Sequence, residues 1–147
     1  MLMFKKAKII TLFFVLGVFL SFSSIAMAQS VSSATTYLGT VYGYTYTSNG
    51  FVETTSYGAR GYSCITCIDS VVPVGYEGIS CYVYNSAGTC VKYSPWSYNT
   101  SSVYSIGSMT GYYNVSGTYY RSKGSCKMYN GSDYTEKPSN YTPYLYY

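Results

Sequence analysis

Hydrophobic and polar residues alternate along most of the chain after residue 28, in short runs of Tyr, Thr and Val that Gly, Asn, Ser and Pro interrupt. Alternation at a period of two is typical of strands, and no segment shows the period of an amphipathic helix. We therefore expect an all-β fold, an antiparallel β-sandwich or barrel of about seven or eight short strands.

The strongest turn signal is Asn49-Gly50, a dipeptide typical of two-residue hairpin loops. It predicts a hairpin between strands at 41–47 and 51–57. In that register Tyr42 would lie opposite Tyr57, which would form a ladder of cross-strand pairs.

Two more hairpins follow from similar signals. One would join 79–84 to 89–94, and in it Cys90 would face Val83. The other would join 118–122 to 125–129 across Lys123-Gly124. Further short strands are predicted at 70–74 and 100–106, whereas the Tyr-rich, Pro-interrupted tail at 138–147 is expected to be loose.

The first 28 residues have a different composition from the rest. Three lysines precede an apolar run at 9–20, and Ala26-Met27-Ala28 forms a small-x-small cleavage site. This pattern predicts a cleaved bacterial signal peptide at 1–28 and a single secreted, extracellular domain at 29–147. The apolar run is shorter than the ~20 residues of a spanning helix, so no membrane anchor is expected.

Without residues 1–28, the chain keeps all 22 Tyr but only one Phe, and six basic residues face five acidic ones, for a net charge of +1. So small a charge gives no support for nucleic-acid binding. Leu and Ile are scarce, so a core must be built largely from Tyr rings and Val. The chain is tyrosine-rich rather than disordered, because disordered chains are poor in aromatic residues.

Five cysteines lie in the predicted secreted part, where disulfides are the rule. Cys64 and Cys67 form a Cys-x-x-Cys motif, which we interpret as structural disulfides to Cys81 and Cys90; a redox pair and a zinc site remain alternatives. Five thiols make at most two bridges, so one cysteine, with Cys126 among the candidates, would be left to stay free or to join two chains.

The sequence shows no catalytic pattern. Without any His, imidazole-dependent nucleophiles and His-ligated metals are excluded. The five carboxylates occur in no recognised setting, and no phosphate- or dinucleotide-binding loop is present. We therefore expect a protein that is not an enzyme and uses no cofactor or metal.

Exposed aromatic residues are the remaining candidates for function. Trp96 and Tyr98 lie in one predicted loop, and Tyr112 and Tyr113 form a second cluster. Such side chains suit binding or antagonism at a cell envelope, through cell-wall glycan or another cell surface. The alternative is a structural protein of a cell, spore or biofilm matrix, since β-prone chains with little charge self-associate.

Overall fold

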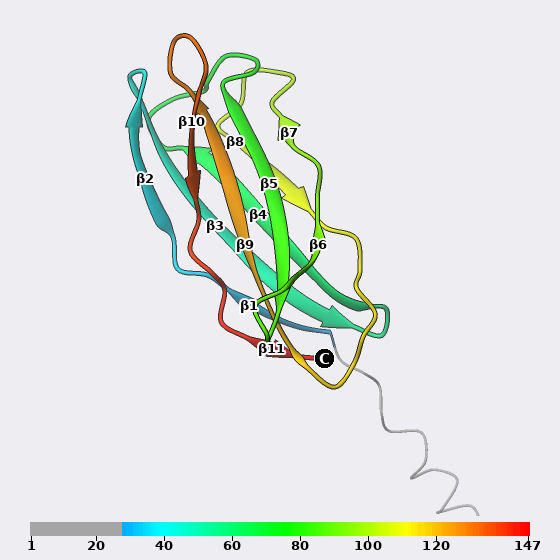
Figure 1. Ribbon diagram of the computed structural model, residues 1–147. Coiled ribbons are helices and arrows are strands. Elements are labelled where there is room, and N and C mark those ends of the chain that lie inside the picture. Colours follow the sequence, from blue (N-terminus) through cyan, green and yellow to red (C-terminus); the bar gives the residue numbers. More distant parts are fainter. Residues whose placement is uncertain (1–27) are drawn as a thin grey trace, which may run out of the picture.

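The computed structural model describes residues 28–147 as two antiparallel β-sheets packed face to face (Figure 1). The first sheet has the order β1-β3-β4-β8, with β2 also paired to β3. The second has the order β10-β9-β5-β6, with β11 paired to β9 and β7 to β5. The strands of the first sheet are β1 (Gln29–Ser32), β2 (Thr36–Val41), β3 (Tyr44–Thr55), β4 (Gly58–Cys67) and β8 (Ser105–Met109). Those of the second are β5 (Glu77–Asn85), β6 (Cys90–Tyr93), β7 (Ser97–Tyr98), β9 (Tyr119–Tyr129), β10 (Tyr134–Pro138) and β11 (Leu145–Tyr146).

The all-β prediction is confirmed, and residues 28–147 contain no helix. Among these residues, no helical segment is available to cross a membrane. The predicted number of strands was wrong, because the two sheets contain eleven. The predicted signal peptide at 1–28 lies outside the described residues, apart from Ala28.

The predicted hairpin at Asn49-Gly50 was wrong, because β3 runs straight through this dipeptide. The chain turns instead at Tyr42-Gly43, where φ is positive at both residues (50° and 82°), as a two-residue hairpin loop of type I′ requires. Gly50 has a different role. A Cβ there would lie 2.3 Å from the carbonyl oxygen of Tyr62 on β4, so only glycine fits.

The predicted turn at Lys123-Gly124 was also wrong, because β9 is one continuous strand. The tail is not loose either, since it follows the edge of β9 along its length. β10 and β11 pair with the two ends of β9, and between them the amides of Ser139 and Thr142 donate to the carbonyls of Gly124 and Ser122 (3.0 and 2.8 Å).

The hairpin of β5 and β6 is as predicted, but its register differs. Cys90 pairs with Tyr84 and Lys92 with Val83, so the intervening residue of β6 forms a bulge. The predicted strands at 70–74 and 100–106 are reduced to a bridge between Val72 and Val103, with β8 beginning only at Ser105.

The interior is divided by a layer of small side chains that we call the waist: Ser48, Gly50, Gly61, Ser63, Ser122 and Gly124. Here the sheets come very close. A Cβ on Gly61 would lie 2.7 Å from that of Ser122, and a Cβ on Gly124 would lie 2.8 Å from that of Ser63. Ser122 Oγ also donates to the Phe51 carbonyl of the opposite sheet (2.9 Å).

Two hydrophobic clusters lie in the interior beside the waist. The larger contains Leu38, Tyr46, Ile65, Cys67, Val72, Ile79, Cys126 and Met128, and the smaller contains Val52, Ala59, Val83, Tyr120 and Leu145. Because glycine and serine fill the waist, two small clusters are enough to close the sandwich. This explains how a chain with so few aliphatic residues builds a core.

The predicted disulfides are absent, since all five cysteines, which lie within the described residues, are free thiols. Cys64 and Cys67 are three positions apart on β4 and therefore point to opposite faces of the sheet. Their motif is thus neither a redox pair nor half of a zinc site. Cys67, Cys81 and Cys126 are buried between the sheets, whereas Cys90 is exposed at the edge strand β6.

Candidate functional site

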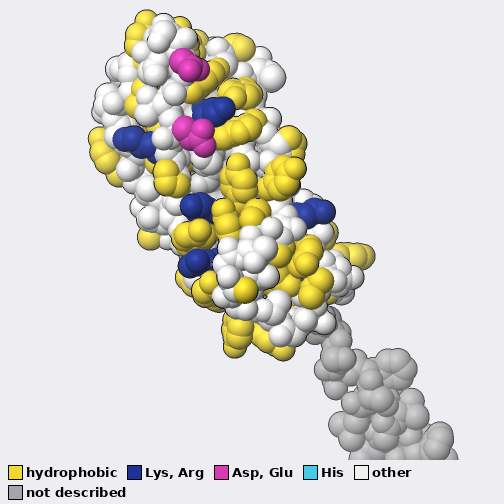
Figure 2. All heavy atoms as spheres, in the orientation of Figure 1, with side chains coloured by type: hydrophobic (Ala, Val, Ile, Leu, Met, Phe, Trp, Pro, Cys, Tyr) yellow, Lys and Arg dark blue, Asp and Glu magenta, His cyan; other side chains and the backbone are white. Residues whose placement is uncertain are grey.

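The outer face of β9 carries a row of basic side chains. Even-numbered residues of this strand are buried against the other sheet, so the odd-numbered ones project outward. Arg121, Lys123 and Lys127 therefore share one face at the centre of their sheet, because β5 pairs along one side of β9 and the tail along the other. Figure 2 shows basic side chains set among hydrophobic ones on the face in view, with acidic ones only in its upper part.

Tyrosine rings surround the first two of these cations. The Arg121 guanidinium lies 3.8 Å from the ring centroid of Tyr141 and 4.8 Å from that of Tyr144. Lys123 Nζ lies 4.8 Å from the Tyr141 centroid and 6.0 Å from that of Tyr84. These are cation–π contacts, which hold each ring and its cation in a defined relative position.

The third cation, Lys127, contacts the aromatic residues of the predicted Trp96–Tyr98 loop. Lys127 Nζ lies 4.3 Å from the Trp96 ring, and the Tyr98 hydroxyl accepts a hydrogen bond from it (3.5 Å). The two rings lie near each other, with centroids 6.4 Å apart and planes inclined by 30°. Gly78 makes room for them, because a Cβ there would lie only 2.7 Å from Cε1 of Tyr98.

Asn99 anchors this loop to the body of the protein. Its buried side chain donates from Nδ2 to the carbonyls of Pro73 and Ser101 (2.7 and 3.0 Å) and accepts from the Glu77 amide (2.9 Å). Three hydrogen bonds from one buried amide hold the end of β7 rigidly. We call the three cations and their rings, Tyr84, Trp96, Tyr98, Tyr141 and Tyr144, the β9 face.

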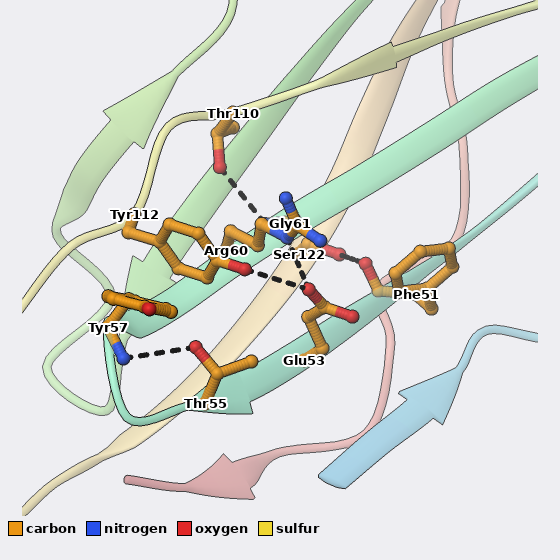
Figure 3. Close-up of polar contacts among 9 residues, drawn as sticks. All are labelled: Phe51, Glu53, Thr55, Tyr57, Arg60, Gly61, Thr110, Tyr112 and Ser122. Atoms are coloured by element: carbon orange, nitrogen blue, oxygen red, sulfur yellow. Dashed lines mark hydrogen bonds and ion pairs between the residues drawn. The ribbon is translucent and has the colours of Figure 1, made fainter. Parts of the chain in front are cut away.

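The structure separates the other two predicted site residues from the β9 face. Tyr113 packs its ring against the buried Tyr120, 6.0 Å between centroids. Tyr112 lies over Arg60, with its ring centroid 4.6 Å from the guanidinium, and Arg60 is ion-paired with Glu53 (Figure 3). Because Glu53 already neutralises the charge of Arg60, the Tyr112 cluster has no free charge to offer a ligand.

A second unusual group is the carboxyl of Glu77, which is fully buried in the interior. Neither of its oxygens accepts a hydrogen bond within the described residues, and the buried hydroxyl of Tyr46 is likewise unpaired. Burial raises the pKa of Glu77 to about 8. Burial, with Cys67 and Glu77 nearby, also raises the pKa of Tyr46. A dissolved substrate cannot contact a carboxyl so enclosed.

Residues 28–147 bring together no group of three or more Cys, Asp or Glu side chains that could hold a metal ion. The β9 face is thus the most distinctive surface feature. Sequence reasoning proposed Trp96 and Tyr98, whose rings the structure brings together, but missed the basic row. The basic row could have been recognised from the basic residues at 121, 123 and 127, which are all odd positions and so share one face of a strand. The predicted turn at Lys123-Gly124 obscured this pattern.

The comparisons with known proteins gave no match: no protein family, no curated protein and no solved structure resembles the chain significantly. The function is therefore inferred from the geometry of the β9 face.

Proposed function

We propose that the protein binds polysaccharide through the β9 face, as a binding protein of a cell envelope rather than an enzyme. The observation that carries this proposal is the row of cations along β9, each of which contacts aromatic rings from neighbouring segments of the chain. Several of the rings are open to solvent, among them Tyr98, Tyr141 and Tyr144, which are about two-fifths exposed (39%, 38% and 41%).

Aromatic rings suit sugars because the apolar face of a pyranose stacks on them while its hydroxyls hydrogen-bond to neighbouring polar groups. Tyr and Trp also offer a large, rigid contact area at a low cost in conformational entropy. On the β9 face this rigidity is increased, since Arg121 and Lys123 contact the Tyr141 ring and Asn99 holds the Trp96 loop. A preorganised surface binds more tightly than one that must be ordered on binding.

Retention of the purified protein on insoluble polysaccharides and washed cell walls tests the proposal. We expect Trp96→Ala and Tyr141→Ala to weaken retention about tenfold each, which corresponds to the loss of one stacked ring at 1–3 kcal/mol, as measured for bases on aromatic side chains. The matched control is Tyr37→Ala, because Tyr37 is 67% exposed but lies on β2 in the other sheet. Equal losses in all three variants, or no retention on any glycan, would refute the proposal.

Cys90 favours a second candidate, the structural or matrix protein. This thiol is exposed on β6, the last strand of its sheet, where a second chain could pair edge to edge and form an intermolecular disulfide. Size-exclusion chromatography with and without reductant tests this. A reductant-sensitive dimer that Cys90→Ser abolishes would support it, and a monomer under all conditions would exclude it.

A further inference from the structure

We propose that the polysaccharide bound by the β9 face is anionic, with its acidic groups meeting Arg121, Lys123 and Lys127. This inference rests on the proposed function and adds the chemical class of the ligand. It starts from how unevenly the charges of the described residues are distributed.

Among residues 28–147, no carboxylate is ion-paired with any of the three cations of the β9 face. The single ion pair found within residues 28–147 joins Arg60 and Glu53, which contact the Tyr112 cluster. Glu136 is the acid adjacent to the β9 face, opposite Lys127 in register, but its carboxylate accepts a hydrogen bond from Ser125 Oγ (2.6 Å) instead. The face therefore keeps a local charge of about +2 in a domain of net charge +1.

The rings hold these cations without neutralising them. A cation–π contact attracts the positive charge to the ring quadrupole but leaves the charge and the remaining N–H donors available. The Nε of Arg121 is buried and has no acceptor within the described part of the chain, so only the terminal nitrogens of its guanidinium could meet a ligand. Carboxylate, sulfate or phosphate groups supply the acceptors that guanidinium and ammonium groups bind most strongly.

The spacing of the cations suits a polymer. Arg121 and Lys127 are six residues apart on one strand, so their Cα atoms lie ~20 Å from each other, with Lys123 between them. A single small anion cannot contact both ends of this row. A linear chain that carries acidic groups at intervals can, while its sugar rings stack on the aromatic side chains between them.

Nucleic acid is the other linear polyanion with stacking rings, and the structure favours it less. Nucleic-acid-binding proteins neutralise many closely spaced phosphates and are usually strongly basic. Three cations in a nearly neutral domain match a polymer whose charges are sparser.

Affinity electrophoresis in gels containing polygalacturonate, or the same polymer after complete methyl esterification, tests the inference. We expect the protein to be retarded about tenfold more strongly by the acidic polymer, since only its carboxylates can accept charge-assisted hydrogen bonds from the three cations. The difference should vanish as salt is raised from about 0.15 M to about 1 M, where the screening length falls from about 8 to 3 Å.

The variants Lys123→Gln and Lys127→Gln should each weaken binding of the acidic polymer more than binding of the ester, which loses only the orientation of the rings that these cations contact. Lys92→Gln is the matched control, because it removes the same charge from outside the β9 face. Lys92 is on β6, where it lies against Gly111 and pairs with the inward-facing Val83. Equal binding of acid and ester would overturn the anionic inference but leave the proposed function standing. Binding of neither polymer nor any neutral glycan would overturn both, and tighter binding of single-stranded DNA would replace polysaccharide with nucleic acid.

Discussion

Replacing the buried acid Glu77 should make the protein more stable, and the gain should depend on pH. In the folded protein the pKa of Glu77 is about 8, against an ordinary value of 4.5. Between these values the unfolded chain has released the proton while the folded protein still binds it. The unfolded state thus binds fewer protons, and the free energy of unfolding must fall as pH rises from about 4.5 to about 8.

The size of this effect follows from the two pKa values. One pKa unit corresponds to ~1.36 kcal/mol, so raising the pH from 5 to 8 should cost the native protein roughly 3–4 kcal/mol through Glu77 alone. Because the chain contains no His, the side chain that ordinarily titrates in this range is absent. The Glu77→Met variant, which replaces the carboxyl with an apolar group of similar size, should be more stable at pH 7 by about 3 kcal/mol.

Urea unfolding at a series of pH values, followed by Tyr and Trp fluorescence, measures both quantities. The native protein should lose stability steadily from pH 5 to pH 8, whereas Glu77→Met should lose little. Glu136→Met is the control, because Glu136 is an exposed carboxylate and its removal should leave the slope unchanged. If Glu77→Met packs poorly, Glu77→Gln should still remove the slope. The reasoning is refuted if the Glu77 variants and the native protein share one slope.

Three further predictions follow from the interior and the loop. Gly61→Ala should destabilise the fold by about 1–3 kcal/mol in urea unfolding, because its methyl group would collide with the Cβ of Ser122. The control Gly111→Ala, whose methyl group would meet only a flexible lysine, should not destabilise it, and an equal loss of stability in both variants would contradict the close approach at the waist. Asn99→Ala should cost ~2–3 kcal/mol by leaving buried backbone groups unpaired, and it should raise hydrogen exchange at Glu77, whereas unchanged exchange would show that the anchor is dispensable. Alkylation without reductant, read by mass spectrometry, should modify the exposed Cys90 and half-buried Cys64 in the native protein and all five cysteines once it is unfolded. The other three thiols are protected because they are buried, and burial raises the pKa of Cys81 to about 11 and of Cys126 to about 12. Fewer than five labels after unfolding would indicate a disulfide.

The period-two pattern was sufficient to predict an all-β fold and the β5–β6 hairpin, because both depend on local alternation and turn residues. It failed at Asn49-Gly50 and Lys123-Gly124, since Gly50 permits the close approach of the neighbouring strand β4 and Gly124 that of the opposite sheet, and neither forms a turn. Only the position of these other strands in the folded protein distinguishes the two roles. Trp96 and Tyr98 could be named as candidates from their residue types alone, whereas the basic row of β9 was divided between two predicted strands that are in fact one.

The alternation within β9 also bears on how the protein could acquire a new ligand. Its even positions, Ser122 and Gly124, set the distance between the sheets, and its odd positions carry the cations. Substitutions at 121, 123 and 127 can therefore change the proposed binding surface while the interior stays intact. Insertion or deletion of a single residue within β9 would exchange the two sets and force lysine into the waist. Variation of this strand in evolution or by design should thus proceed by replacement and never by a change of length.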